Sequence, residues 1–394
     1  MATSAKPSSL QRVAAVFRDV RVLQGIAQVV FVLLVVLAAR WLIGNLLESI
    51  ETRGLSLSFE FLRRTAGFMI GEGLPMERTN SFFYAYIVGL VNSLRVILVG
   101  LVLATVVGIM AGLALLSPNW LLRSIVSAYV EIMRNTPLLV QLFFLYFGVI
   151  LRLPSLQDRL VLGPFNLSNR GFFFPRPVPQ PGFSFWLGSL MAGLVLGAVV
   201  YRILLKRRLL HGVETRPGLW AALLIFGLPS AGWLLSPGRP LLLENPVLIG
   251  LRMEGGARLS PEFAGILLGL VLYTAAFIAD IVRAGILAVP KGQTEAARSI
   301  GLTGFQVTRF VVLPQAMRVI VPPLTNQYLN LAKNSSLAVG VGYPDLYNVS
   351  STIFNQSGQA VQVISLMMVT YLVMSLSISV IMNFINDRLK IPER

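Results

Sequence analysis

The chain has 394 residues, of which 55% are apolar and only 13% are charged, and its 33 basic and 17 acidic residues give a net charge of +16. A soluble domain carries roughly 25% charged residues, so this composition excludes a water-soluble globular protein as well as a disordered or collagen-like chain. The absence of cysteine and the single histidine exclude a disulfide framework, a cysteine nucleophile and a histidine-rich metal centre. We therefore predict an integral membrane protein.

A membrane-spanning helix needs ~18–20 predominantly apolar residues, and eight segments of the chain meet this requirement. They lie at about 24–46, 92–116, 125–151, 184–205, 217–236, 261–289, 315–340 and 362–386. The seventh is the weakest because Pro322 and Pro323 interrupt it, although a helix bundle tolerates such breaks. The predicted fold is all-α, a polytopic bundle of about eight transmembrane helices.

Three segments between the spans carry local signals. The aromatic stretch 81–91 is too short to cross a membrane, and we predict that it lies along the interface as an elbow before the second span. The segments 152–183 and 237–260 are rich in proline and glycine, which favours irregular or extended backbone in connecting loops.

The distribution of charge predicts the orientation in the membrane. With the N-terminus in the cytoplasm, the inner loops and tails hold 17 basic and five acidic residues, whereas the outer loops hold eleven arginines and ten acids. This asymmetry follows the positive-inside tendency. We expect both termini in the cytoplasm and no nucleic-acid partner, because the positive residues are scattered between apolar runs.

The loop 290–314 contains signals for a first short helix. Thr294 is predicted to cap a helix that opens with Glu295, since an acid suits the positive end of the helix dipole. Gly301 then provides the permissive backbone that ends this helix.

A second short helix follows in the same loop. Thr303 and Gln306 have the spacing of a capping box, and Pro314 is predicted to mark the far end of this helix. A simple connector between two spans needs only a few residues, so we expect this helix–turn–helix to contact a partner in the cytoplasm.

The loop also carries Glu295, Ala296 and Ala297, followed by Gly301 and, thirteen positions later, Pro314. These residues resemble the EAA signature of ABC-importer permeases. In that family the loop docks its short helices into a groove on the ATP-binding subunit. The resemblance implies that these five residues couple the chain to cytoplasmic ATP-binding subunits.

Further stretches resemble the polar-amino-acid uptake permeases of the same class. They are Asn92–Arg95, Glu131–Phe144, Tyr273–Ile286 and Asn326–Leu337. The resemblance covers about 85–151 and 261–390. The first span and the two spans within 184–236 are additions to the five-helix core of that family, and they resemble the long permease subunits of general L-amino-acid transporters.

The resemblance implies a type I ABC-importer permease core with extra helices in a bacterial inner membrane. Residues 1–80 would form an N-terminal cytoplasmic tail, the first transmembrane helix and a periplasmic segment. Residues 81–151 would form the first part of the core, and 152–260 the inserted periplasmic loops and two extra helices. Residues 261–394 would form the second part, which includes the coupling loop at 290–314.

ATP hydrolysis must take place on another chain. A phosphate-cradling loop ends in Gly-Lys-Ser/Thr, and none of the five lysines is followed by serine or threonine. We therefore expect no enzymatic activity, no catalytic residue and no cofactor on this chain, with ATP and Mg²⁺ bound by the partner ATPase. The resemblance implies cytoplasmic ATP-binding subunits, a second homologous permease subunit and a periplasmic solute-binding protein as partners, with an L-amino acid as substrate and lipid around the spans.

An amino acid carries a carboxylate and an ammonium, so its path must offer donors and acceptors. Asp280 and Gln141 are the most economical pair near mid-span, with Thr274 and Asn330 as further candidates. An intramembrane charge faces protein or a water-filled cavity. Asp280 could therefore line the path or pair with Arg283 three residues further on. A second such pair would be Glu131 with Arg134, and Gln141 could equally form a helix–helix hydrogen bond.

Two other functions compete with that of an ABC permease. An ion-coupled secondary transporter would use intramembrane acids but would not need the docking loop. An intramembrane hydrolase or transferase lacks support, because the sequence contains neither a Gly-x-Ser-x-Gly elbow nor a metal-ligand cluster.

Overall fold

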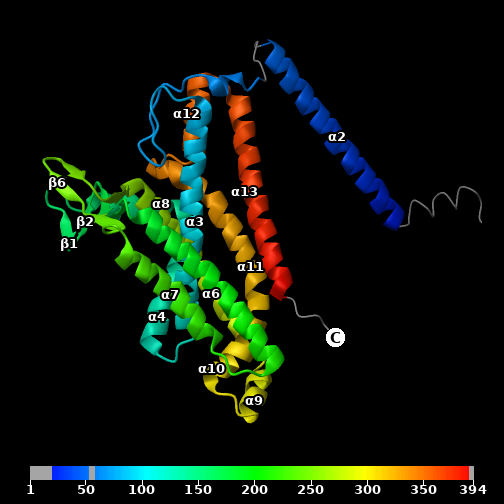
Figure 1. Cartoon of the computed structure of the whole chain (residues 1–394). Coiled ribbons are helices and arrows are strands. Elements are labelled where there is room, and N and C mark those ends of the chain that lie inside the picture. The colour runs from blue at the N-terminus through cyan, green and yellow to red at the C-terminus, as the bar shows by residue number, and fades with distance from the viewer. Residues whose placement is uncertain (1–19, 53–57, 390–394) are drawn as a thin grey trace, which may run out of the picture.

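The computed structural model describes residues 20–52 and 58–389. The expected cytoplasmic tail therefore falls largely outside the described residues, as do the last residues of the chain, 390–394. Figure 1 shows a bundle of long helices, with α9 and α10 protruding at one end and α12 lying at the opposite end. We call these the loop end and the far end of the bundle.

The helices follow the predicted order of spans. They are α2 (Val20–Thr52), η1 (Glu60–Arg63), α3 (Phe82–Leu115), α4 (Trp120–Asn135), α5 (Leu138–Phe143), η2 (Phe144–Val149), η3 (Ile150–Arg152), α6 (Phe183–His211), α7 (Pro217–Leu235), α8 (Pro261–Leu287), α9 (Lys291–Ser299), α10 (Gly304–Val307), η4 (Thr308–Val312), α11 (Leu313–Asn334), η5 (Ser335–Val341), α12 (Leu346–Ser357) and α13 (Ala360–Leu389). Within the described part of the chain, seven helices are long and apolar enough to span a membrane, or eight if a bent pair counts as one span. The predicted class, an all-α membrane bundle, is confirmed.

The third span is not the continuous helix that 125–151 predicted. α4 ends at Asn135 and the chain turns by 112° before continuing as α5 to η3. Thr136 is extended, with φ −110° and ψ 139°. It precedes Pro137, whose ring disfavours helical backbone in the residue before it. The proline thus breaks an apolar run that composition alone marks as one helix.

The predicted interfacial elbow at 81–91 is also wrong. The side chain of Ser81 accepts a hydrogen bond from the backbone N–H of Tyr84 at 3.2 Å and caps α3. From Phe82 the chain then continues as one helix of 34 residues. The aromatic residues therefore form the first turns of the second span, at the far end of the bundle.

The two proline-rich segments form extended backbone, as predicted, and they pair with each other. Their strands are β1 (Leu160–Leu162), β2 (Phe165–Ser168), β3 (Gly171–Phe174), β4 (Arg176–Pro179), β5 (Leu241–Glu244), β6 (Val247–Ile249), β7 (Arg252–Glu254) and β8 (Ala257–Leu259). All pairs are antiparallel, in the orders β1-β2-β3-β8, β4-β5 and β6-β7. An ion pair of 2.7 Å between Arg176 and Glu244 joins β4 to β5. The hairpin of α6 and α7 is thereby closed at its base.

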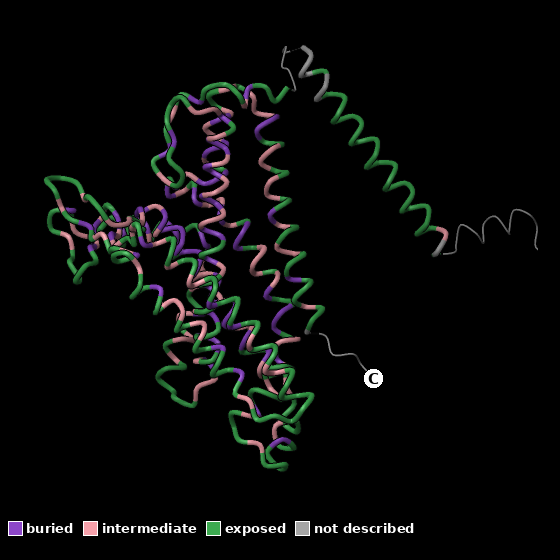
Figure 2. Tube along the Cα trace, viewed as in Figure 1, coloured by how far each residue is buried: buried purple, intermediate pink, exposed green. Residues whose placement is uncertain are grey.

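α3 and α8 form the most extensive helix–helix contact among the described residues. Small residues recur every four positions along α3, at Gly100, Ala104, Gly108 and Gly112, and all four are buried. A Cβ atom added at Gly108 would lie 2.6 Å from the Cβ of Ile278 on α8. Spacing of this kind lets two helix backbones approach closely where lipid, not water, is the solvent. Figure 2 shows the buried residues concentrated in this central part, whereas α2 is almost entirely exposed.

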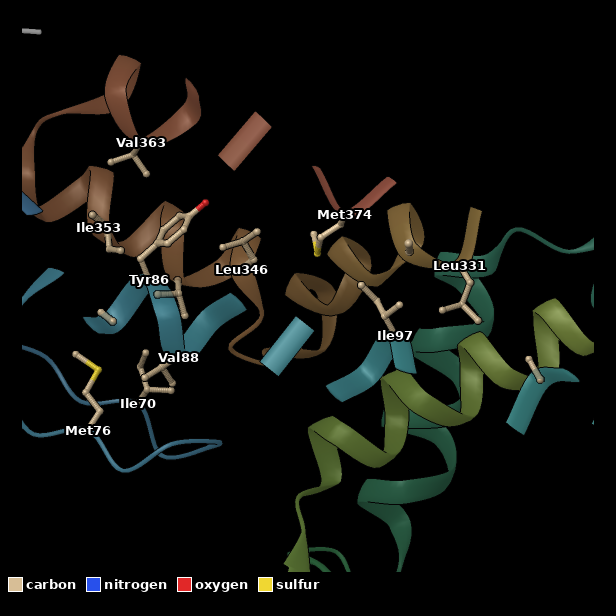
Figure 3. Packing of buried hydrophobic residues seen from close by; sticks show 14 of the residues in the cluster. Ile70, Met76, Tyr86, Val88, Ile97, Leu331, Leu346, Ile353, Val363 and Met374 are labelled. Atoms are coloured by element: carbon tan, nitrogen blue, oxygen red, sulfur yellow. The ribbon is translucent and has the colours of Figure 1, made fainter. Parts of the chain in front are cut away.

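The far end of the bundle is held together by buried polar groups on α3. The side-chain amide of Asn92 donates to the backbone oxygens of Glu72 at 3.1 Å and Pro344 at 2.9 Å. The hydroxyl of Ser93 accepts the backbone N–H of Leu346 at 2.9 Å. Apolar residues on α3, α12 and α13 pack around these bonds, and Figure 3 shows part of this cluster. The 58–80 segment and α12 are thus fixed to α3.

Asp345 caps α12 and is only 1% exposed. Its carboxylate accepts the backbone N–H of Asn348 at 2.8 Å and the hydroxyl of Tyr371 at 3.4 Å. Burial raises the pKa of this carboxyl from 3.8 to about 7, although the hydrogen bond from the Asn348 backbone acts in the opposite direction. The charged form is therefore costly in the folded protein.

We predict that Gly108→Ala destabilises the bundle, whereas Gly100→Ala does not. The new methyl at Gly108 would overlap Ile278, while one at Gly100 would lie 3.5 Å from Leu331, an ordinary contact. Overpacking of this kind costs about 1–3 kcal/mol, and both substitutions gain the same helix propensity. The thermal midpoints of the purified variants measure the difference. Equal midpoints would show that α3 and α8 can separate without cost.

A second prediction concerns pH and Asp345. Because its folded-state pKa of about 7 exceeds the ordinary value of 3.8, the folded protein takes up a proton that the unfolded chain does not. The free energy of unfolding should therefore increase as the pH falls from about 7 toward 4. Asp345→Asn preserves the cap and should flatten this dependence. Thermal midpoints recorded between about pH 8 and pH 5 test this, and parallel curves for the two proteins would contradict it.

Candidate functional site

The first short helix of the loop begins earlier than predicted. α9 starts at Lys291, directly after Pro290, and Thr294 lies inside it with its hydroxyl donating to the backbone oxygen of Lys291 at 2.7 Å. The prediction of Thr294 as the cap is wrong, because Pro290 with φ −60° already directs the chain into the helix. Within α9 only Ala297 is buried, while Glu295 and Ala296 are exposed.

The turn after α9 agrees with the prediction for Gly301. Its φ of +86° lies in the left-handed region that favours glycine. The backbone N–H of Gly301 donates to Arg298 at 2.9 Å, and that of Leu302 donates to Ala297 at 3.2 Å, which satisfies the last carbonyls of α9. Glycine at this position allows the chain to reverse between the two short helices.

The predicted capping box is confirmed, but the role predicted for Pro314 is not. The backbone N–H of Thr303 donates to Gln306 Oε1 at 2.8 Å, and the Gln306 N–H donates to Thr303 Oγ1 at 3.4 Å. α10 then continues through the π-helical η4 into α11, with Pro314 in the first turn of α11. A proline is tolerated there because the preceding π-helical turn has already interrupted the regular α-helical hydrogen-bond pattern. The second short helix is therefore the beginning of a long one.

The loop presents apolar side chains to solvent. Ile300, Phe305 and Phe310 are 77%, 72% and 62% exposed, and Glu295 in the same loop is exposed as well. Clustered apolar exposure of this kind marks an interaction surface. We call these four residues the docking face. Glu295 was predicted from the sequence, whereas the three apolar residues were not, because the loop contains other apolar residues and their exposure depends on how the helices fold.

The charged residues inside the spans pair differently from the prediction. Arg134 on α4 forms an ion pair with Asp280 on α8, and its guanidinium lies 5.4 Å from the ring centre of Phe277. Asp280 is therefore not paired with Arg283, nor Arg134 with Glu131, which accepts the hydroxyl of Ser127 at 3.4 Å. An arginine side chain is long enough to reach a neighbouring helix. A spacing of three residues along one helix therefore does not decide which carboxylate it pairs with.

Gln141 holds the bend in the third span. Its side-chain amide donates to the backbone oxygens of Met133 at 2.8 Å and Thr136 at 3.0 Å, and to the Thr136 hydroxyl at 2.6 Å. It thus satisfies the free carbonyls where α4 ends. Its Oε1 atom is buried and lacks a hydrogen-bond partner in the described part of the chain.

The four predicted substrate residues are not brought together. Gln141 is buried at the bend and Thr274 is only 2% exposed, whereas Asp280 is partly accessible and Asn330 is exposed. Among residues 20–52 and 58–389, no hydrogen bond joins any two of these four. Asp280 instead contacts Arg134, which in turn lies over the ring of Phe277. Neither Arg134 nor Phe277 was predicted as a substrate residue.

The chain combines a bundle of helices able to span a membrane with a helical loop that protrudes at one end (Figure 1). Residues 217–390 match the family described as the binding-protein-dependent transport system inner membrane component. The chain belongs to the permease subunits of ABC importers. It is a transport component and not an enzyme, since a partner subunit hydrolyses ATP in such systems.

Three relatives are similar over nearly their whole lengths. The "Putative amino-acid ABC transporter permease protein YhdX" of Escherichia coli (strain K12) is 44% identical over 93% of this chain and 94% of its own. The "General L-amino acid transport system permease protein AapQ" of Rhizobium johnstonii is 40% identical, with 93% and 92% covered. The "Glutamate/glutamine/aspartate/asparagine transport system permease protein BztB" of Rhodobacter capsulatus is 36% identical, with 98% of each chain covered.

We predict that Asp280→Asn and Arg134→Gln each lower the thermal midpoint by about 1–2 °C, as expected for losing roughly 1 kcal/mol in a protein of 394 residues. The exchange Arg134→Asp with Asp280→Arg should recover part of the loss, because the pair is restored in the opposite order. Glu131→Gln is the matched control and should leave the midpoint unchanged. If it lowers the midpoint as much as Arg134→Gln, the pair between α4 and α8 is not the stabilising contact.

Proposed function

We propose that this chain forms the translocation path for L-amino acids in an ATP-driven importer and is coupled to cytoplasmic ATPase subunits by residues 290–314. The observation that supports this proposal is the exposed docking face. Glu295, Ile300, Phe305 and Phe310 are exposed on a helical loop that protrudes beyond the spans. The coupling residues predicted from the sequence, Glu295 to Ala297, Gly301 and Pro314, either belong to this loop surface or shape it.

The proposed orientation places the loop and both termini in the cytoplasm of a bacterial inner membrane. In Figure 1 α13 runs from the far end of the bundle toward the loop end, and α2 stands apart from the bundle with its start directed away from the far end. The positive-inside tendency supports the assignment of the loop end to the cytoplasm. The far end would then face the periplasm.

The substrate class is proposed from the chemistry of the path and from the named relatives. Arg134 and Asp280 offer one charge of each sign on facing helices, which matches the carboxylate and the ammonium of an amino acid. As α4 and α8 separate, the substrate carboxylate would replace Asp280 beside Arg134, and the substrate ammonium would replace Arg134 beside Asp280. Asn330 is accessible in the present arrangement, whereas Gln141 and Thr274 would contact substrate only after the helices around them move.

The far end contains an entrance suited to a polar solute. A cavity of about 440 Å³ lies between the 68–72 segment, the start of α8 and α12. Its lining includes Glu72, Arg258, Glu262 and Asn348. We propose that a periplasmic solute-binding protein delivers the amino acid here. We also propose that a second homologous permease subunit completes the path, and that ATP and Mg²⁺ bind only to the ATPase subunits.

Uptake by the reconstituted complex tests the proposal. Radiolabelled L-amino acids should accumulate in vesicles only when the binding protein is outside and ATP is inside. The secondary-transporter alternative lacks support from the relatives, which are permeases of ABC systems. Accumulation on an ion gradient alone, without ATP, would overturn the proposal.

For the coupling loop, we predict that Glu295→Lys abolishes most ATP-dependent uptake while the chain still inserts into the membrane. The reversed charge would oppose a basic groove on the ATPase. Glu214→Lys is the matched control, since Glu214 is also exposed and lies in the turn between α6 and α7. Uptake and the amount of copurified ATPase are measured together. Normal uptake with Glu295→Lys would show that the loop only connects two spans and does not couple to the ATPase.

A further inference from the structure

A second cavity lies near the loop end, between the end of α3, the start of α4 and the last turns of α8. Its volume is about 280 Å³. The lining consists of Leu115, Trp120, Arg123, Ser124, Ser127 and Arg283. None of these residues takes part in the proposed coupling or substrate contacts.

The lining is strongly positive. Arg123 and Arg283 come from different helices, and neither forms an ion pair within the described residues. No carboxylate lines the cavity, and Glu131 lies one helical turn beyond Ser127, whose hydroxyl it accepts. Two guanidinium groups around one small space repel each other unless an anion lies between them. The positive-inside tendency explains why arginines occur at this end, but not why two of them converge on one cavity.

The donors favour a phosphate group. Guanidinium groups bind phosphate through paired N–H donors, and Ser124 and Ser127 add two hydroxyls to the same lining. An amino-acid substrate fits poorly, because its ammonium would find no carboxylate. The ligand expected here is therefore an anion without a positive group beside it.

The surroundings indicate that this anion carries acyl chains. Trp120 lines the cavity and is 69% exposed, and Leu121, Leu122 and Ile125 on the same first turns of α4 are 58%, 44% and 61% exposed. Tryptophan is typical of the membrane–water boundary. Exposed apolar side chains thus share the first turns of α4 with Trp120, Arg123 and Ser124 of the positive cavity, which suits a molecule with a phosphate head and hydrocarbon tails.

We propose that this cavity binds the phosphate of an anionic phospholipid, such as phosphatidylglycerol, between Arg123 and Arg283. The bound headgroup bridges the start of α4 and the last turns of α8, a few residues before the coupling loop begins at Lys291. Neutralising the two guanidinium groups stabilises this arrangement of α4 and α8. The proposal is independent of the transported substrate.

Fluorescence of Trp120 tests the site in the intact transporter complex in nanodiscs. The difference between wild type and Trp120→Phe isolates the emission of this residue from that of the other tryptophans. Brominated phosphatidylglycerol should quench it at least twofold more than brominated phosphatidylcholine at the same mole fraction. Arg123→Gln with Arg283→Gln should remove the preference. Arg207→Gln with Arg208→Gln, which removes two exposed charges from α6, should leave it intact.

Thermal midpoints separate a lipid from free phosphate and remain informative if the double variant assembles poorly. Phosphatidylglycerol should raise the midpoint of wild type above that in phosphatidylcholine, and the single variant Arg123→Lys should retain part of the increase. Inorganic phosphate added to phosphatidylcholine nanodiscs should have little effect. A shift with inorganic phosphate but not with phosphatidylglycerol would overturn the lipid assignment. Equal quenching of Trp120 by the two brominated lipids would overturn it as well.

Discussion

The close approach of α3 and α8 is the contact on which the rest of the bundle depends. In lipid, helices gain little from hiding apolar surface, so tight packing must hold them together. Gly108 and Gly112 allow it, because an added Cβ atom would lie 2.6 Å from Ile278 and 2.8 Å from the backbone oxygen of Ala279. α4, α5 and α11 then pack on α8, while α12 packs on α3. The ion pair and the far-end cluster are both built on this pair of helices.

The parts of the structure that the sequence predicted are those decided by local signals. Apolar length identified the spans, and the spacing of Thr303 and Gln306 identified the capping box. The conformational freedom of glycine identified the turn at Gly301. The bend at Pro137 was also encoded locally, through the restriction on Thr136, but apolar length was given more weight than the proline. The start of α9 was misplaced for a similar reason. Thr294 is a common capping residue, but Pro290 fixes a backbone angle that starts the helix at Lys291.

The remaining features depend on contacts between distant parts of the chain. Arg134 and Asp280 are 146 positions apart, so a search for partners within a helical turn selects the wrong residues. The pairing of β4 with β5 encloses two whole spans, and nothing in either strand alone specifies the other. Gln141 illustrates a third difficulty. An amide in the middle of a span suits a substrate contact, but its N–H groups donate to the free backbone oxygens at the end of α4. The capping box and the glycine turn of the loop could therefore be predicted from local spacing, whereas the partners of the polar side chains inside the spans could not.

The uninterrupted path from α10 through η4 and α11 to η5 has a mechanical consequence. Residues Gly304–Val341 form one continuous run of 38 helical residues, in which the π-helical η4, Pro322 and Pro323 within α11, and the 3-10 segment η5 are the points where the helix can bend. Since no irregular loop separates the short helix of the coupling loop from the span, a displacement at Phe305 is transmitted through helical backbone toward the other end of the run. That end adjoins Tyr343 and Asp345, which are bonded to α3 and α12. Force applied at one surface of the membrane would thus be felt at the opposite surface without any intermediate refolding.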